Sequence, residues 1–218
     1  LIDSGADWLC YGMGERTILE FTRAIEAGRN IGDIRKIPQL SFYMDGRCRL
    51  KDAVVLNSYE RCCKDKIAFA ENFHVIETYA NMMNPPVLVE PVGNGYVQIN
   101  PTWPSGTQEE MDSFWDLPYT KLPHPRYKGR HIPAYEMIKF SVNTHRGCFG
   151  GCNFCTIAAH QGKFIQSRSE DSILKEIRAL NELPGFAGNI SDVGAPTANM
   201  YGMQGKDRSL CEKCRRKS

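Results

Sequence analysis

The segment Arg146-Gly147-Cys148-Phe149-Gly150-Gly151-Cys152-Asn153-Phe154-Cys155 places three cysteines within eight residues. Their C-x3-C-x2-C spacing puts three thiolates on one short loop, and its glycines let the backbone curl around a small metal centre. A [4Fe–4S] cube has four irons, so three cysteines leave one iron open to another ligand. An open metal position is typical of a site that carries out chemistry.

Two other interpretations of the three cysteines follow from spacing alone. A disulfide with one spare thiol is disfavoured, because a three-residue gap fits disulfide geometry poorly. A zinc site with three cysteines and one histidine is the stronger alternative, because His145 and His160 flank the cysteines. The spacing therefore indicates a metal centre and leaves both iron–sulfur and zinc open.

The residues around the cysteines predict a βαβ unit. Residues 137–143 are expected to form a strand that leads into the cysteine loop. Ser169 is the expected N-cap of the following helix, and residues 189–193 are expected to form the next strand. The helix would bury Ile173, Leu174, Ile177 and Leu180. This order is that of the first unit of a parallel barrel, in which chemistry sits at the carboxyl ends of the strands.

These motifs resemble the radical S-adenosylmethionine (SAM) superfamily, and in particular its YgiQ-type branch. The similarity covers Ile132–Ile157, Gly162–Glu170 and Ile190–Tyr201, and continues more weakly towards the N-terminus. The resemblance implies an enzyme in which Cys148, Cys152 and Cys155 hold a [4Fe–4S] cluster. It further implies that SAM binds the open iron and is cleaved reductively to a 5′-deoxyadenosyl radical. It supplies no substrate.

The resemblance also suggests residues that contact SAM and a partner that supplies electrons. Phe154 occupies the position at which family members contact the adenine. Gly194-Ala195-Pro196 occupies the place of a Gly-Gly-Glu-like turn that holds the methionine amino group, although it lacks the second glycine and the glutamate. Asp192 is a further polar candidate. A flavodoxin or ferredoxin is the expected electron donor.

The N-terminal part predicts a different kind of α/β structure. A strand near Trp8–Tyr11 is followed by a Gly-x-Gly-Glu turn and a helix over residues 16–27, which Gly28 ends. This region resembles the end of the open, flavodoxin-like sheet of cobalamin-binding-like domains, although the Asp-x-His-x-x-Gly cobalamin signature is absent. We expect residues 1–135 to be the end of this domain plus a linker, and residues 136–218 to begin a partial TIM-like radical SAM barrel.

Between these parts, residues 38–56 predict a hairpin around Asp45-Gly46, and residues 87–100 predict another around Asn94-Gly95. Residues 59–83 predict the longest helix, with a buried face of Cys62, Phe69, Phe73, Ile76, Ala80 and Met83. Cys62, Cys63 and His74 are expected to serve packing or the surface. Thr107 with Glu110 forms a capping box that starts a further helix.

Composition narrows the classes of function. The chain has 218 residues, is 42% hydrophobic and carries a net charge of +2, which does not indicate nucleic-acid binding. Nine cysteines without a secretory segment indicate metal binding or reduced thiols in a cytoplasmic protein, and no apolar run is long enough to span a membrane. The chain starts without Met and ends near Cys211-x-x-Cys214, which suggests a fragment; these two cysteines are a candidate second metal site or simply free thiols.

Overall fold

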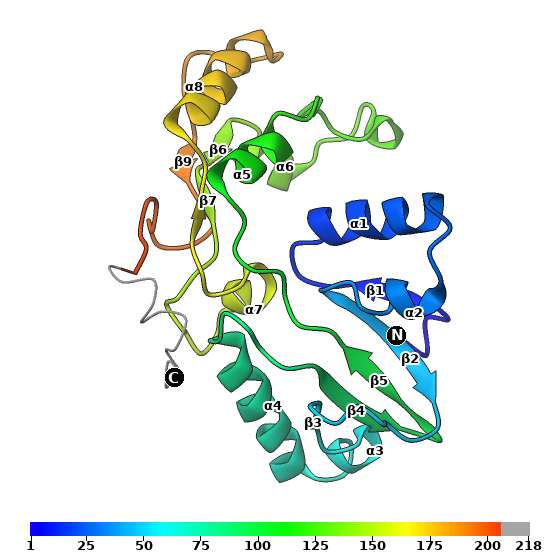
Figure 1. Cartoon of the computed structure of the whole chain (residues 1–218). Helices are drawn as coiled ribbons and strands as arrows, with labels where there is room; N and C mark the ends of the chain where they lie inside the picture. The colour runs from blue at the N-terminus through cyan, green and yellow to red at the C-terminus, as the bar shows by residue number, and fades with distance from the viewer. Residues whose placement is uncertain (206–218) are drawn as a thin grey trace. The chain divides into compact units, whose positions relative to one another are not determined.

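The structure is a computed structural model, and it describes residues 1–205. The chain forms two compact units (Figure 1). The first contains residues 1–104 with 159–161, and the second contains residues 105–158 and 162–204. Within the described residues, no helix is long and apolar enough to cross a membrane.

The first unit is built on a mixed five-stranded sheet in the order β1-β2-β5-β4-β3. Its strands are β1 (Trp8–Cys10), β2 (Leu40–Asp45), β3 (Val54–Val55), β4 (Leu88–Val92) and β5 (Gly95–Ile99). Only β3 and β4 pair in parallel, whereas the other three pairs are antiparallel. The α/β class is therefore confirmed as a mixed, open sheet, and the flavodoxin-like description stays a prediction.

The two hairpin predictions had different outcomes. The hairpin over residues 87–100 is confirmed by the β4–β5 pair, but Val92 faces Gly95, so Gly93 and Asn94 form the turn. Gly93 has a φ of 54°, as the first central residue of a type II′ turn requires. The hairpin around Asp45-Gly46 is wrong, because β2 pairs with β5 and β3 pairs with β4. The Asp45-Gly46 turn signal predicts pairing between the strands next to it, and it cannot show that β2 pairs with the more distant β5 instead.

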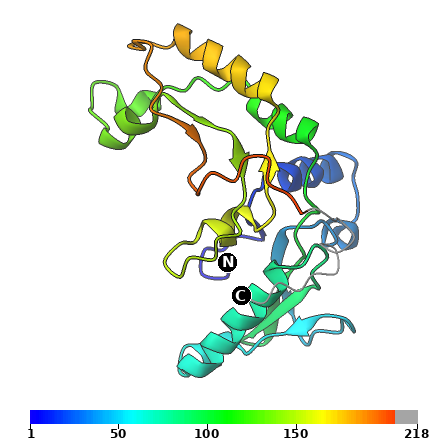
Figure 2. The ribbon, with the colours of Figure 1, turned by 90° about the vertical axis from the view of Figure 1, so that its left-hand side faces the viewer.

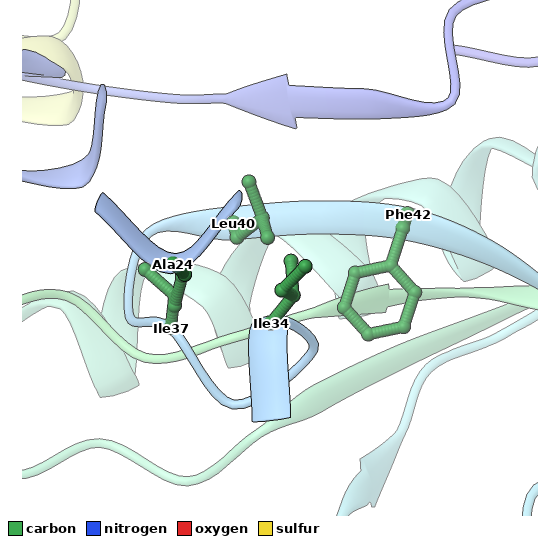
Figure 3. Close-up of a cluster of buried hydrophobic side chains, with 5 residues drawn as sticks. All are labelled: Ala24, Ile34, Ile37, Leu40 and Phe42. Carbon is green, nitrogen blue, oxygen red and sulfur yellow. The ribbon is translucent and has the colours of Figure 1, made fainter. Parts of the chain in front are cut away.

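Helices α1 (Glu15–Glu26) and α2 (Ile31–Ile34) cover the β1–β2 end of this sheet. The core between them consists of Ala24, Ile34, Ile37, Leu40 and Phe42 (Figure 3). Trp8 and Phe21 pack against this core, with tilted ring contacts among Trp8, Phe21 and Phe42. Gly28, with a φ of 62°, follows α1 and ends it as the sequence predicts.

The predicted long helix is two helices, α3 (Tyr59–Cys62) and α4 (Lys66–Ala80). Asp65 separates them because its side chain accepts a hydrogen bond from the Ile67 N–H and caps α4. The predicted buried face is also wrong: α4 buries Ala68 and Asn72, whereas Phe69 and Phe73 are 63% and 60% exposed. Asn72 is drawn inwards because its amide bonds both the N–H and the C=O of Asn57.

The second unit contains the segment with the cysteines. Its helices are α5 (Gln108–Trp115), α6 (Pro133–Ile138), α7 (Ile157–Gln161, whose last three residues group with the first unit) and α8 (Glu170–Ala179), with short 3-10 turns η1 (Pro125–Tyr127) and η2 (Leu180–Glu182). Its strands are β6 (Ser141–Asn143), β7 (His145–Arg146), β8 (Gln166–Ser167) and β9 (Asp192–Gly194). Thr107 caps α5 and Ser169 caps α8, as predicted.

The predicted βαβ unit is confirmed. Strands β6 and β9 pair in parallel, with Asn143 opposite Gly194, and α8 packs on β6 (Figure 2 shows this unit from a second side). The core here contains Val142, Ile173 and Leu180, while Leu174 is exposed against expectation. The strand predicted from residue 137 begins only at Ser141, because Pro133 occupies the first turn of α6. Whether this unit belongs to a TIM-like barrel, and whether the domains divide at residue 135, remain predictions.

Candidate functional site

A short antiparallel pair closes the base of the cysteine loop. Strands β7 and β8 pair His145 with Ser167 and Arg146 with Gln166, so the loop between them leaves and returns at one place. The N–H of Cys148 donates to the carbonyl of Gly162 at 3.0 Å, just beyond this pair. The predictions from sequence did not include this closure, because two-residue strands carry no periodicity.

Gly147 makes that closure sterically feasible. Its φ is 91°, and a Cβ at this position would lie 2.3 Å from the carbonyl oxygen of Phe164. Other residues would therefore both strain the backbone and push the returning strand away. Gly151, in the same loop, has a φ of 63° and nothing within 4 Å of its missing Cβ. Gly147 thus serves close packing, whereas Gly151 serves backbone conformation alone.

The structure places the three cysteines on this loop as free thiols. Cys148 and Cys155 are half-buried, and Cys152 is exposed. Gly150 lies between the first two: its N–H donates to Cys148 Sγ at 3.4 Å, and its missing Cβ would lie 3.4 Å from Cys148 Sγ and 3.8 Å from Cys152 Sγ. A side chain at this position would fill the space that both sulfurs face.

The side chains are not gathered into a preformed metal-ion geometry. Over residues 1–205, no group of three or more His, Cys, Asp or Glu side chains is arranged to hold a metal ion. His145 is buried, and its two ring nitrogens lie 3.0 Å from Thr144 Oγ1 and 3.1 Å from Thr197 Oγ1. Zinc ligation by His145 would break one of these hydrogen bonds, which disfavours the Cys3His interpretation with this histidine.

The parallel pair brings the second predicted segment to the same edge. Gly194 ends β9, and its carbonyl accepts a hydrogen bond from the Thr144 N–H at 2.6 Å. The cysteine loop and the Gly194-Ala195-Pro196 turn therefore both start at the carboxyl ends of neighbouring strands. Asp192 is exposed on β9, with its carboxylate oxygens 3.7 Å from where a Gly194 Cβ would lie.

Phe154 projects into solvent and is 90% exposed, so it is not a core residue of the described structure. Its assignment to SAM stays a prediction. Cys211 and Cys214 lie outside the described residues, so their role stays a prediction too.

The family described as Radical SAM N-terminal matches residues 1–141. The chain belongs to the radical SAM superfamily, in its YgiQ-type branch. No solved structure matches the chain significantly.

Relatives within this branch cover the entire chain, including the cysteine loop. It is 50% identical to a UPF0313 protein of Bacteroides thetaiotaomicron, 44% identical to one of Methanocella arvoryzae and 36% identical to YgiQ of Escherichia coli. Each match covers 100% of this chain but only 37%, 36% and 37% of the respective relative. The chain thus spans little more than a third of the length of these radical SAM relatives.

Sequence reasoning missed Arg168, which stabilises the base of the cysteine loop. Its side chain is 1% exposed, although arginine is usually a surface residue. The guanidinium donates to the Asn143 carbonyl at 2.6 Å, to Ser172 Oγ and to the Ser172 carbonyl, and it pairs with Glu176. Arg168 therefore links the end of β6 to α8. Its contact with Asn143 spans 25 residues of sequence, so no local sequence signal could reveal it.

Two further contacts surround this arginine. The ring of Trp115 lies under two cations, with the guanidinium carbon of Arg146 at 4.3 Å and that of Arg168 at 5.1 Å from its centroid. The hydroxyl of Tyr201 donates to the Arg168 carbonyl at 2.9 Å. Tyr201 also lines a cavity of about 350 Å³, together with Thr144, Glu170, Ile173, Leu174, Val193 and Asn199.

Proposed function

We propose that this chain is part of a radical SAM enzyme in which Cys148, Cys152 and Cys155 bind a [4Fe–4S] cluster and the Gly194-Ala195-Pro196 turn binds SAM. The observation that carries this proposal is the placement of three free thiols on a closed loop at the carboxyl end of β6. In an α/β unit this is the edge at which ligands and catalytic groups collect. Membership of the radical SAM superfamily supports the same chemistry.

The residues of the loop fit an iron–sulfur cluster chemically. Thiolates are the ligands that such clusters require, and three of them leave one iron for a non-protein ligand. The Gly150 N–H already donates to Cys148 Sγ, and hydrogen bonds to sulfur stabilise the anionic charge of thiolate ligands. Gly150 also keeps the space beside Cys148 and Cys152 free of a side chain.

When bound, the cluster would supply the electron that cleaves the sulfonium of SAM into methionine and a 5′-deoxyadenosyl radical. The residues of the chain bind and orient. The turn after β9 lacks a glutamate, so its backbone carbonyls are left to bind the methionine ammonium group. Phe154 offers an apolar surface for the adenine. Without the glutamate, we expect weak SAM binding and a rate that rises over a wide SAM range.

The electron must come from a separate protein or reagent, and a flavodoxin or ferredoxin is the proposed donor. The described cysteines are all free thiols, which supports a reducing, cytoplasmic environment. The substrate that the radical would attack is left open, because the matched relatives are nearly three times longer than this chain and their remaining parts would help to shape the pocket.

The first test compares two cysteine variants of the full-length gene product after anaerobic reconstitution with iron and sulfide. Cys152→Ala should lose the cluster, because two thiolates cannot hold a cube with one iron free. Cys63→Ala is the matched control, since Cys63 is also an exposed free thiol but lies in the other unit. Iron content and charge-transfer absorbance are the readouts. Equal iron in both variants would show that the ligand assignment is wrong.

The second test measures turnover. The reduced protein with SAM should release 5′-deoxyadenosine and methionine, slowly even without substrate, as chromatography of the quenched mixture can measure. A protein with an intact reduced cluster but no 5′-deoxyadenosine would instead be a non-catalytic module stabilised by iron and sulfur. A colourless protein with zinc would support a zinc-stabilised binding module.

A further inference from the structure

The side chain of His145 joins the two segments that the proposed function brings together. It is 1% exposed and belongs to β7, at the entry to the cysteine loop. Its Nδ1 lies 3.0 Å from Thr144 Oγ1, and its Nε2 lies 3.1 Å from Thr197 Oγ1. Thr197 immediately follows the Gly194-Ala195-Pro196 turn. One imidazole therefore connects the beginning of the cysteine loop to the end of the turn.

The chemistry of these contacts suits a neutral ring. Burial lowers the pKa of His145, because the imidazolium loses its hydration, and a weaker interaction with the Ala198 carbonyl opposes this shift. A neutral imidazole has one donor and one acceptor nitrogen, and a threonine hydroxyl can serve as either partner. Thr197 Oγ1 donates its one proton to the Ala198 carbonyl, so it accepts from the Nε2–H tautomer. Nδ1 then accepts from Thr144 Oγ1, and the neutral ring holds both hydroxyls without carrying a charge.

The turn is attached at both of its ends. At its start, the Gly194 carbonyl accepts from the Thr144 N–H at 2.6 Å, and Thr144 Oγ1 lies 3.2 Å from the same carbonyl oxygen. At its end, Thr197 contacts His145 and also donates to the Ala198 carbonyl at 2.8 Å. Ala195 and Pro196 thus lie between two anchored positions, which are held by the adjacent residues Thr144 and His145 just after β6.

We propose that His145 is a positioning residue for SAM binding, which fixes the Gly194–Thr197 turn beside the cysteine loop through the hydroxyl of Thr197. This inference rests on the proposed function. A turn that must bind an ammonium group through backbone carbonyls depends on its conformation, because ordering a loose turn during binding would cost affinity. A glutamate would offer a flexible side chain instead, and this turn has none.

Substitutions at Thr197 test the anchor with little disturbance of the fold. Thr197→Val removes the hydroxyl and keeps the shape, and Thr197→Ser is the matched control that keeps the hydroxyl. His145→Phe removes the other partner of the same contact. For each variant of the full-length gene product, iron content and the SAM dissociation constant are measured after reconstitution. In the cluster-free protein, hydrogen–deuterium exchange of peptides covering residues 194–201 is measured as well.

We expect Thr197→Val and His145→Phe to retain wild-type iron and to bind SAM about tenfold more weakly, which corresponds to about 1.4 kcal/mol. Exchange in residues 194–201 should be about tenfold faster in Thr197→Val, while peptides from α8 should be unchanged. Thr197→Ser should match the wild type in each measurement. Weaker SAM binding with unchanged iron content would distinguish a positioning role from a general loss of structure.

Two results would overturn the inference. One is wild-type SAM affinity and exchange in Thr197→Val. The other is loss of iron in proportion to loss of SAM binding, because the contact would then hold the cysteine loop and not the turn. If the wild-type protein takes up no cluster, the proposed function fails, whereas exchange in the cluster-free Thr197→Val and Thr197→Ser proteins still reports whether the anchor exists.

Discussion

Replacing Gly147 by alanine should open the cysteine loop, and replacing Gly151 should not. Both glycines have positive φ, so each alanine would carry a conformational cost of about 1–2 kcal/mol. Reduced freedom of the unfolded chain would offset about 0.4–1 kcal/mol of this cost. For Gly151→Ala, whose Cβ would meet nothing within 4 Å, the net loss should therefore be about 1 kcal/mol.

Gly147→Ala has a further steric cost. Its Cβ would lie 2.3 Å from the oxygen and 2.9 Å from the carbon of the Phe164 carbonyl, whereas ordinary contact begins at 3.4 Å. The returning backbone must retreat, which would break the Cys148–Gly162 hydrogen bond and the β7–β8 pair. At about 1 kcal/mol for each lost hydrogen bond, the total should reach about 3–4 kcal/mol.

The assay is hydrogen–deuterium exchange of peptides covering residues 144–168 in the cluster-free, full-length gene product, followed by iron content after reconstitution. The difference of at least about 2 kcal/mol between the variants corresponds to roughly 30-fold faster opening in Gly147→Ala. This variant should also retain less than about half of the wild-type iron, while Gly151→Ala should retain nearly all of it. Equal exchange in the two variants would refute the proposed role of the β7–β8 closure.

Three other predictions concern buried polar groups. Asn72→Ala should cost about 2–3 kcal/mol of stability, because the Asn57 N–H loses its partner. Phe73→Ser should change stability by no more than about 0.5 kcal/mol, because Phe73 is exposed. Chemical denaturation measures both variants, and a larger loss in Phe73→Ser than in Asn72→Ala would favour the buried face predicted from sequence. Arg168→Met should cost about 1–3 kcal/mol, because the Asn143 carbonyl loses this donor and the Glu176 carboxylate keeps only its ion pair with Lys121. Arg168→Lys should recover only part of this loss, and full recovery by lysine would contradict the role of the planar guanidinium. The pKa of His145 is lowered in the folded state by burial, so the unfolded state binds more protons. Stability should therefore fall as pH decreases through about 6.5 towards the folded pKa, by at most about 1.4 kcal/mol per pH unit. The pH profile of His145→Gln should lack this slope, and an unchanged slope in that variant would contradict the assignment.

Much of the local structure was predictable because its causes are local. Ser169 caps α8 and Thr107 caps α5, since a side-chain oxygen beside a helix start satisfies backbone donors a few residues away. The βαβ order around the cysteine loop followed from periodicity and from the helix start at Ser169. The hairpin over residues 87–100 followed from turn chemistry, although its turn lies one residue earlier than expected.

The errors came where a distant partner decides the outcome. The sequence of residues 59–83 has an apolar face, but α4 buries Ala68 and Asn72 instead, because the Asn72 amide satisfies the backbone of Asn57. Residues 40–45 precede a turn signal, yet β2 pairs with β5, which lies more than fifty residues later. Neither choice is encoded by spacing, because it depends on which segments meet after the chain has collapsed.

The sequence by itself predicted a metal centre on one short loop, because the C-x3-C-x2-C spacing places three thiolates within eight residues. It also determined that this loop follows a strand and precedes a helix. Only the tertiary structure showed that Arg168 is buried against the end of β6 and that His145 reaches Thr197. These contacts join residues 25 and 52 positions apart, and a buried polar side chain is stabilised by partners that only the folded chain brings within hydrogen-bonding distance.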